Sequence, residues 1–188
     1  MSKSTVLTLV GSLRADSTNR KLAEAIQLNA PEDLDIVIYE TLGNLPFYNE
    51  DIDIEGQVPA AAAALRAAAN EADALLLVTP EHNGTMPASL KNAVDWLSRP
   101  YGAGALTGKP TAVVGTAFGQ FGGVWAQDEA RKAAGIAGAR VLEDAKLAVR
   151  GSMVRFAETH PKDDAEVVEQ IKGIFSALAA AEKAEAAA

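Results

Sequence analysis

Short apolar runs alternate with longer amphipathic stretches along most of this chain. Runs of β-branched and leucine residues at Thr5–Val10, Ala74–Val78 and Pro110–Thr116 are typical of strands buried on both faces. Residues 35–39 predict a further strand, and 139–142 with 145–149 are candidate pieces of a fifth. Helical spacing predicts helices at Asn19–Asn29, Pro59–Ala72, Met86–Ser98, Val124–Ala134 and Ala165–Ala181.

This alternation of strands and helices predicts a parallel sheet with right-handed crossovers. A length of 188 residues suits one buried core, so we expect one domain over residues 1–188. Pro59 is expected in the first turn of its helix, and the connection Leu42–Val58 is expected to be irregular. The alanine-rich tail, residues 179–188, is expected to extend the last helix and fray.

A polar loop follows the first predicted strand and opens a helix. It carries hydroxyls, an arginine and an amide, at Ser12, Arg14, Ser17, Thr18 and Asn19. In one interpretation a serine, threonine or asparagine of this loop simply caps the helix. In the other, backbone amides, hydroxyls and one guanidinium hold a phosphate at the helix N-terminus. The second interpretation accounts for Arg14 as well as the hydroxyls.

Two further loops follow the third and fourth predicted strands. The second loop, Thr79–Gly84, contains Pro80, Glu81, His82 and Asn83; it could aim peptide groups at the edge of a flat heterocycle, or be an ordinary turn with a surface histidine. The third loop, residues 116–123, is rich in glycine and has two phenylalanines that could wall a planar ligand. Because ligands of open α/β sheets bind at the carboxyl ends of strands, these loops define a candidate site.

Composition limits the classes of partner. The formal charge of −8 argues against nucleic acid, whose binding requires neutralisation of phosphates. The absence of cysteine excludes a disulfide scaffold, a thiolate metal site and a cysteine nucleophile. No His, Asp and Glu cluster has the spacing of metal ligands, so no metal is expected. No signal peptide or membrane span is predicted, so a cytoplasmic location is the simplest interpretation.

Sequence motifs for other chemistries do not match. Gly108-Lys109 is followed by Pro110, so it is not a phosphate-binding P-loop, and no G-x-G-x-x-G follows the first strand. No nucleophile and base stand out as a pair, so no catalytic side chain is predicted. A well-made ligand crevice without such side chains indicates that a cofactor supplies the chemistry.

Two motifs together resemble the NADPH-dependent FMN reductase family, which includes flavin, quinone, azo-dye and chromate reductases. They are Gly11-Ser12-Leu13-Arg14 with Ser17 and Asn19, and Pro80-Glu81-His82-Asn83-Gly84 followed by Leu90-Lys91-Asn92-Ala93-Val94-Asp95-Trp96. The resemblance covers about residues 4–150. It implies a flavodoxin-like three-layer α/β sandwich with a five-stranded parallel sheet in the order 2-1-3-4-5. Many members have tyrosine at the position of His82, a difference that bears on acceptor preference because this side chain faces the substrate.

The resemblance also implies a function and a set of binding residues. FMN would be the cofactor, NADPH or NADH the hydride donor, and a quinone, azo compound, chromate or free flavin the small-molecule acceptor, in a ping-pong sequence. The phosphate would lie on Ser12, Arg14, Ser17, Thr18 and Asn19. The ring would lie along Pro80, Glu81, His82, Asn83 and Gly84, and its other side would be closed by Thr116, Phe118, Gly119, Gly122 and Gly123.

Members of the family are usually homodimers or homotetramers, which the resemblance extends to this chain. Two alternatives remain from the residues. One is a non-catalytic electron carrier of the flavodoxin type, which the acidic charge suits. The other is a flavin-free binding module for a different phosphorylated metabolite.

Overall fold

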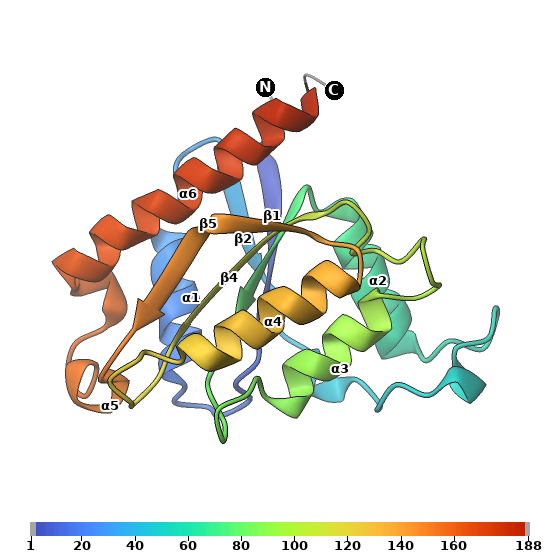
Figure 1. Ribbon diagram of the computed structural model, residues 1–188, viewed down its shortest axis with the longest axis horizontal. Helices are drawn as coiled ribbons and strands as arrows, with labels where there is room; N and C mark the ends of the chain where they lie inside the picture. Colours follow the sequence, from blue (N-terminus) through green and yellow to red (C-terminus); the bar gives the residue numbers. More distant parts are fainter. Residues whose placement is uncertain (1–2, 187–188) are drawn as a thin grey trace.

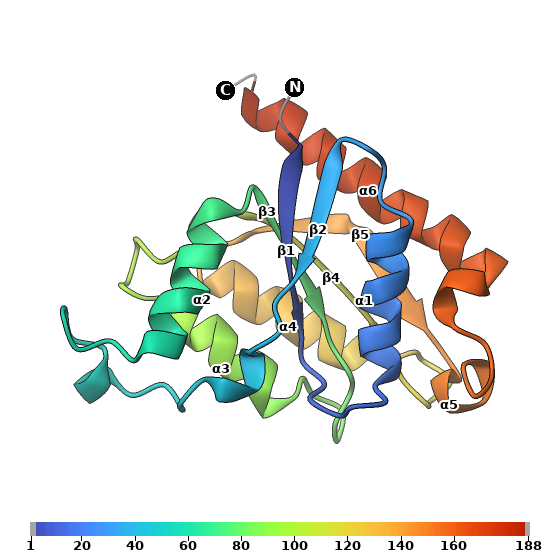
Figure 2. The same cartoon turned by 180° about the vertical axis from the view of Figure 1, so that it is seen from behind.

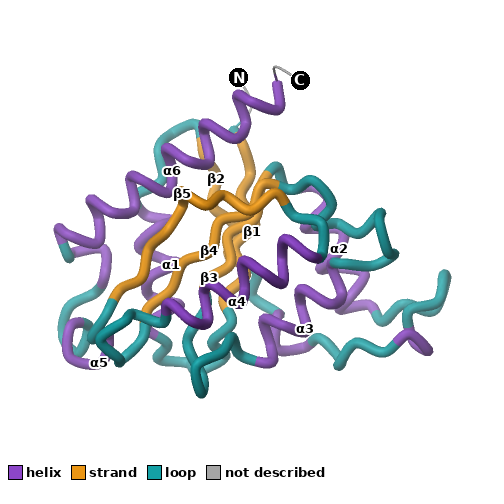
Figure 3. The backbone as a smooth tube through the Cα atoms, viewed as in Figure 1, coloured by secondary structure: helices purple, strands orange, loops and turns teal. Residues whose placement is uncertain are grey.

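The computed structural model describes residues 3–186 and has a five-stranded sheet at its centre. The strands are β1 (Ser4–Val10), β2 (Leu34–Ile38), β3 (Ala74–Val78), β4 (Pro110–Thr116) and β5 (Arg140–Val149). All neighbours pair in parallel, in the order β2-β1-β3-β4-β5. Figure 3 shows the strands gathered at the centre, with helices around them. The sheet order and the flavodoxin-like sandwich implied by the resemblance are therefore confirmed.

Helices cover both faces of this sheet (Figures 1 and 2). On one face α1 (Thr18–Leu28) and α6 (Ala165–Ala186) pack against Val6 and Val10 of β1. On the other face α2 (Ala60–Glu71), α3 (Ala88–Leu97) and α4 (Val124–Ile136) pack against Leu7 and Leu9. The alternation of side chains along β1 thus serves two separate hydrophobic layers, which is why the strand is apolar throughout.

The two candidate pieces of the fifth strand, 139–142 and 145–149, belong to one strand, β5, which begins at Arg140. It is continuous, but its pairing with β4 shifts between Thr111 and Val113, so that Thr111 pairs with Val141 and Val113 pairs with Lys146. The buried guanidinium of Arg131 in α4 lies at this break and donates to the Val113 carbonyl oxygen at 2.8 Å. The bulge keeps one strand intact where an apolar pattern alone suggests an interruption.

Other elements refine the expected boundaries. Pro59 is the N-cap of α2 rather than part of its first turn, with an extended ψ of 137°. The connection 42–58 contains two short 3-10 turns, η1 (Leu42–Asn44) and η2 (Glu50–Ile52). Neither α5 (Ser152–Arg155) nor η3 (Pro161–Asp163) was predicted. The last helix extends to Ala186 as expected, and residues 187–188 of the tail lie outside the described residues.

Candidate functional site

The loop after β1 rests directly on the loop after β3. The Gly11 amide donates to the Val78 carbonyl oxygen at 2.9 Å, and the Ser89 hydroxyl donates to the Gly11 carbonyl oxygen at 2.6 Å. A Cβ on Gly11 would lie 2.8 Å from Cγ of Pro87, so only glycine fits here without movement. Figure 2 shows the two loops together at the carboxyl ends of their strands, where the sequence placed a binding site.

The first turn of α1 combines a helix cap with free donors. Ser17 is buried and its hydroxyl accepts from the Arg20 amide at 3.2 Å, so this residue is the N-cap. The hydroxyls of Ser12 and Thr18 are half-buried, and Arg14 is exposed. Among the side chains that the structure describes, none forms an ion pair with Arg14. Capping therefore accounts for Ser17, and Ser12, Arg14 and Thr18 are left for the anion-binding interpretation.

Asn19 connects the first loop to the third. Its Nδ2 donates to the Thr116 carbonyl oxygen and its Oδ1 accepts from the Thr116 amide, both at 2.9 Å. The Thr116 hydroxyl in turn donates to the Val149 carbonyl oxygen at 2.7 Å. Asn19 is buried, and each polar atom of its side chain already has a protein partner. The structure therefore gives Asn19 and Thr116 a positioning role between α1 and β4.

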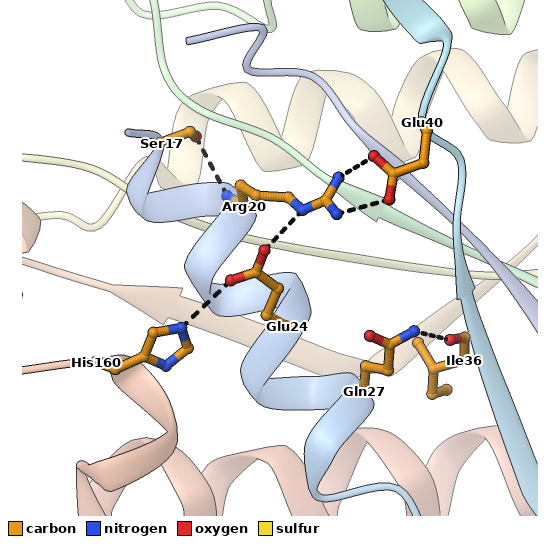
Figure 4. Close-up of polar contacts among 7 residues, drawn as sticks. All are labelled: Ser17, Arg20, Glu24, Gln27, Ile36, Glu40 and His160. Atoms are coloured by element: carbon orange, nitrogen blue, oxygen red, sulfur yellow. Dashed lines mark hydrogen bonds and ion pairs between the residues drawn. The ribbon is translucent and has the colours of Figure 1, made fainter. Parts of the chain in front are cut away.

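Charged side chains fix the outer side of α1, as Figure 4 shows. Arg20 donates to both carboxylate oxygens of Glu40 at 2.6 Å and to Glu24 at 2.9 Å. His160 lies 3.4 Å from Glu24, and Gln27 donates to the Ile36 carbonyl oxygen at 2.7 Å. The hydrogen bonds from Arg20 lower the pKa of Glu40. Each exposed pair contributes little stability, but together they orient α1 relative to β2.

The second loop ends in a tight hairpin. His82 and Thr85 exchange two backbone hydrogen bonds of 3.0 Å, and the residues between them, Asn83 and Gly84, have φ values of 54° and 78°. Positive φ at both central residues is what a type I′ turn requires, and Asn-Gly is its preferred sequence. The Asn-Gly pair therefore fixes the backbone that carries His82.

Two carboxylates attach this hairpin to α4: Glu81 beside the hairpin and Glu129 within α4. Glu81 accepts from the Ala126 amide in the first turn of α4 at 3.2 Å. Glu129 of α4 accepts from the Thr85 hydroxyl and, at 3.0 Å, from the Met86 amide. A carboxylate at a helix N-terminus is favoured by the helix dipole. Glu81, which the sequence placed beside the ligand, thus also caps a neighbouring helix.

The third loop follows β4 and is shaped by two glycines. Gly122 and Gly123 have φ values of 63° and 80°, and a Cβ on Gly122 would lie 2.6 Å from the Ala148 carbonyl oxygen. Phe118 and Gly119 are exposed. The loop lies against the second loop, since a Cβ on Gly123 would be 3.5 Å from Cβ of Glu81.

A cavity of about 610 Å³ lies between the first loop, His82, the start of α3 and the segment after β2. Ser12, Arg14 and His82 from the predicted site line it, and the third loop lies outside it. The sequence prediction missed the other side chains of its walls: Leu13, Leu42, Leu45, Phe47, Pro87, Ala88, Ser89 and Asn92. The predicted sheet could have identified the segment after β2 as part of the site, because this segment leaves the sheet at the same edge as the loops after β1 and β3.

The chemistry of this cavity fits an anionic ligand with a flat ring. Hydrogen-bond donors line the cavity at Ser12 and Arg14. The N-terminus of α1, whose dipole favours a phosphate, follows in the same loop. Apolar walls from Leu42, Leu45 and Pro87 suit a planar heterocycle. FMN has both parts. Within the part of the chain that the structure describes, no three His, Asp or Glu side chains gather as a metal site would require.

An ion pair further along the segment after β2 makes the stability of the fold pH-dependent. Both carboxylate oxygens of Asp53 accept from Arg66, at 2.6 and 2.7 Å, and these hydrogen bonds lower the pKa of Asp53. Because the lowered pKa belongs to the folded state, the pair stabilises the fold above the unfolded value of about 4 and this contribution is lost as the pH falls through the lowered pKa.

We therefore expect Asp53→Asn to be less stable than the parent protein at neutral pH, with a difference that shrinks below about pH 4. Urea unfolding at a series of pH values measures this difference. Asp51→Asn, an exposed carboxylate of the same turn, is the matched control. A difference between Asp53→Asn and the parent that stays constant down to low pH contradicts the assignment.

Fold and site together define a flavodoxin-like α/β protein whose ligand edge suits a flavin phosphate. Sequence comparison agrees: the family described as NADPH-dependent FMN reductase matches residues 4–153. This chain belongs to the NADPH-dependent FMN reductase family. It is an oxidoreductase whose cofactors are FMN and NAD(P)H, which confirms the resemblance seen in the sequence.

Individual relatives are similar over most of the chain. A quinone reductase of Pseudomonas putida is 48% identical over 127 residues, which are 68% of this chain and 67% of that protein. A 2-hydroxy-1,4-benzoquinone reductase of Burkholderia sp is 44% identical over 126 residues, 67% of each protein. The structure of FerB, a flavoenzyme NAD(P)H:(acceptor) oxidoreductase from Paracoccus denitrificans, superposes with a TM-score of 0.84 at 31% identity, covering 96% of this chain and 98% of FerB.

Proposed function

We propose that this enzyme uses NAD(P)H to reduce quinones, with the donor and the acceptor occupying the same cavity in turn. The cavity between Arg14 and the segment 42–47 carries this proposal, since it is an open site beside side chains that could hold the FMN phosphate by hydrogen bonds. The similarity to quinone reductases supports the choice of acceptor. Bound at this site, FMN would supply the two-electron chemistry that connects NAD(P)H to the acceptor.

The residues of this chain bind and orient the reactants. Ser12, Arg14, Thr18 and the amides at the start of α1 would hold the phosphate, while Ser17 caps the helix and Asn19 fixes its position. The rigid backbone from Pro80 to Gly84 would border the ring. The third loop would border it on the side of Glu81, against which Gly123 lies. His82 lines the cavity and would contact the substrate.

The decisive experiment is reduction of the FMN-loaded protein under anaerobic conditions. We expect NADPH or NADH to bleach the flavin absorbance and a quinone to restore it. Steady-state rates at several concentrations of both substrates should give parallel double-reciprocal lines, the pattern of a ping-pong sequence. Intersecting lines would show that donor and acceptor bind together.

The same experiment separates the alternatives. An electron carrier, which the charge of −8 would suit, takes electrons from NAD(P)H only through a partner reductase. A protein that fails to bind FMN would instead be a module for another phosphorylated metabolite. Azo compounds, chromate and free flavin serve as further acceptors in the panel.

The proposed function also includes an oligomeric state and a cellular location. We propose a homodimer or homotetramer on the basis of the family resemblance, and we propose the cytoplasm as its location. No helix among residues 3–186 is long and apolar enough to cross a bilayer. Light scattering at several protein concentrations measures the oligomeric state.

A further inference from the structure

The segment between β2 and α2 forms one wall of the cavity and carries an exposed aromatic side chain. Figures 1 and 2 show this segment extending past the end of α3. Phe47 lines the cavity, yet its side chain is 78% exposed. A single exposed aromatic residue is unremarkable by itself. What sets Phe47 apart is how firmly its backbone is held.

Asn92 of α3 forms hydrogen bonds with the backbone on both sides of Phe47. Its Oδ1 accepts from the Tyr48 amide at 2.8 Å, and its Nδ2 donates to the Pro46 carbonyl oxygen at 3.0 Å. Trp96, one turn further along α3, donates from Nε1 to the same oxygen at 2.8 Å. The Asn92 side chain is only 8% exposed and Trp96 is fully buried. We call this pair of side chains the Phe47 clamp.

The Phe47 clamp is itself braced by aromatic and charged contacts. Tyr48 lies edge-on against Trp96, with ring centroids 5.0 Å apart. Arg66 of α2 donates from Nε to the Trp96 carbonyl oxygen at 2.9 Å, and its guanidinium lies 5.2 Å from the Trp96 ring centroid. The same guanidinium holds Asp53, further along the segment. Phe47 is therefore an exposed ring on a fixed backbone, which loses little backbone freedom when it contacts a ligand.

We propose that Phe47 sets the acceptor selectivity of this enzyme, favouring flat aromatic acceptors such as quinones, and that Asn92 and Trp96 are positioning residues acting through it. The inference rests on the proposed function, since it concerns the acceptor that enters the same cavity. Contact between the Phe47 ring and a flat acceptor buries apolar surface and allows ring stacking. A compact inorganic acceptor without a ring gains neither.

The first test compares a naphthoquinone with ferricyanide, an acceptor that has no flat ring. We expect Phe47→Ala to lower the ratio of kcat/KM for naphthoquinone to kcat/KM for ferricyanide about five- to tenfold, mainly through the KM for naphthoquinone. Gln27→Ala removes an amide-to-carbonyl bond on the other face of the sheet and is the matched control (Figure 4). An unchanged ratio in Phe47→Ala overturns the selectivity role. Failure of the parent protein to reduce either acceptor overturns the proposed function itself.

The second test asks whether Asn92 acts through Phe47. We expect Asn92→Ala to lower the same ratio, and the double variant with Phe47→Ala to show no further drop, because the clamp has nothing left to position. Effects that multiply in the double variant overturn the positioning role. Should Asn92→Ala not fold, Trp96→Phe takes its place in the cycle, since it keeps a ring and removes one donor to Pro46.

A third measurement needs no flavin or substrate. The chain has two tryptophans, so Trp125→Phe leaves Trp96 as the one fluorescent reporter of the clamp. Its fluorescence should resist quenching by acrylamide, because the side chain is fully buried. Adding Asn92→Ala should raise the quenching constant severalfold, and adding Gln27→Ala should leave it unchanged. Equal quenching with and without Asn92 overturns the clamp.

Discussion

Replacing Gly115 by alanine is expected to destabilise the protein by about 3 kcal/mol, near the upper end of typical overpacking costs. Gly115 is the last residue but one of β4, where the chain leaving β3 crosses close to it. The Thr79 amide donates to the Val114 carbonyl oxygen at 2.9 Å, and a Cβ on Gly115 would overlap the Thr79 carbonyl oxygen. The clash is with backbone on both sides, so no side chain can move to relieve it. Urea unfolding measures the loss.

Gly173→Ala is the matched control for this substitution. Gly173 lies exposed in α6, and a Cβ there would meet open space. Glycine inside a helix is less stable than alanine by about 0.5–1 kcal/mol, so this change should stabilise the protein slightly. If Gly115→Ala unfolds within about 0.5 kcal/mol of the parent, the close approach of β4 to Thr79 does not constrain the second loop.

Replacing Arg14 by alanine is expected to weaken FMN binding by about 1.5–3 kcal/mol, or roughly 10- to 150-fold in Kd. Arg14 lines the cavity, is exposed, and forms no ion pair with another residue of the described chain, so its charge is available to a phosphate. Riboflavin has the same ring without the phosphate, so its affinity should change little. Titration of both compounds into the apo protein measures the difference.

The control for net charge is Lys3→Ala. Lys3 precedes β1, at the opposite edge of the sheet from the cavity, and its loss changes the charge by the same amount. We expect FMN affinity to be unchanged in this variant. Equal losses of affinity for FMN and riboflavin in Arg14→Ala would show that Arg14 shapes the cavity rather than holding the phosphate.

The elements predicted from the sequence agree best with the structure where a strand or helix depends on residues close together in the chain. Continuous apolar runs predicted the three central strands β1, β3 and β4, because a strand buried on both faces has few polar positions. Pro59 was expected one position too far inside its helix, since proline suits both the N-cap region and the first turn. The two candidate pieces of the fifth strand belong to one strand, because a bulge tolerates polar residues such as Glu143 and Asp144 without ending the strand.

The candidate site was predictable in outline and not in detail. The polar first loop and the motif Pro80–Gly84 located the ligand edge, because chain order and parallel pairing bring those loops together. The roles within the loops could not be read from residue type. A hydroxyl or an amide can cap a helix or bind a ligand, and Ser17 and Asn19 turned out to be bonded within the protein.

By itself, the sequence determined the strand and helix succession, the family and the position of the polar loop that we propose holds the phosphate, since each depends on residues close together in the chain. Only the tertiary structure decided that the segment around Phe47 is a wall of the cavity and that Asn92 and Trp96 hold it, across separations of more than forty residues. Hydrogen bonds over such distances depend on how helices are placed on the sheet, and that placement is a property of the whole packed core rather than of any local pattern.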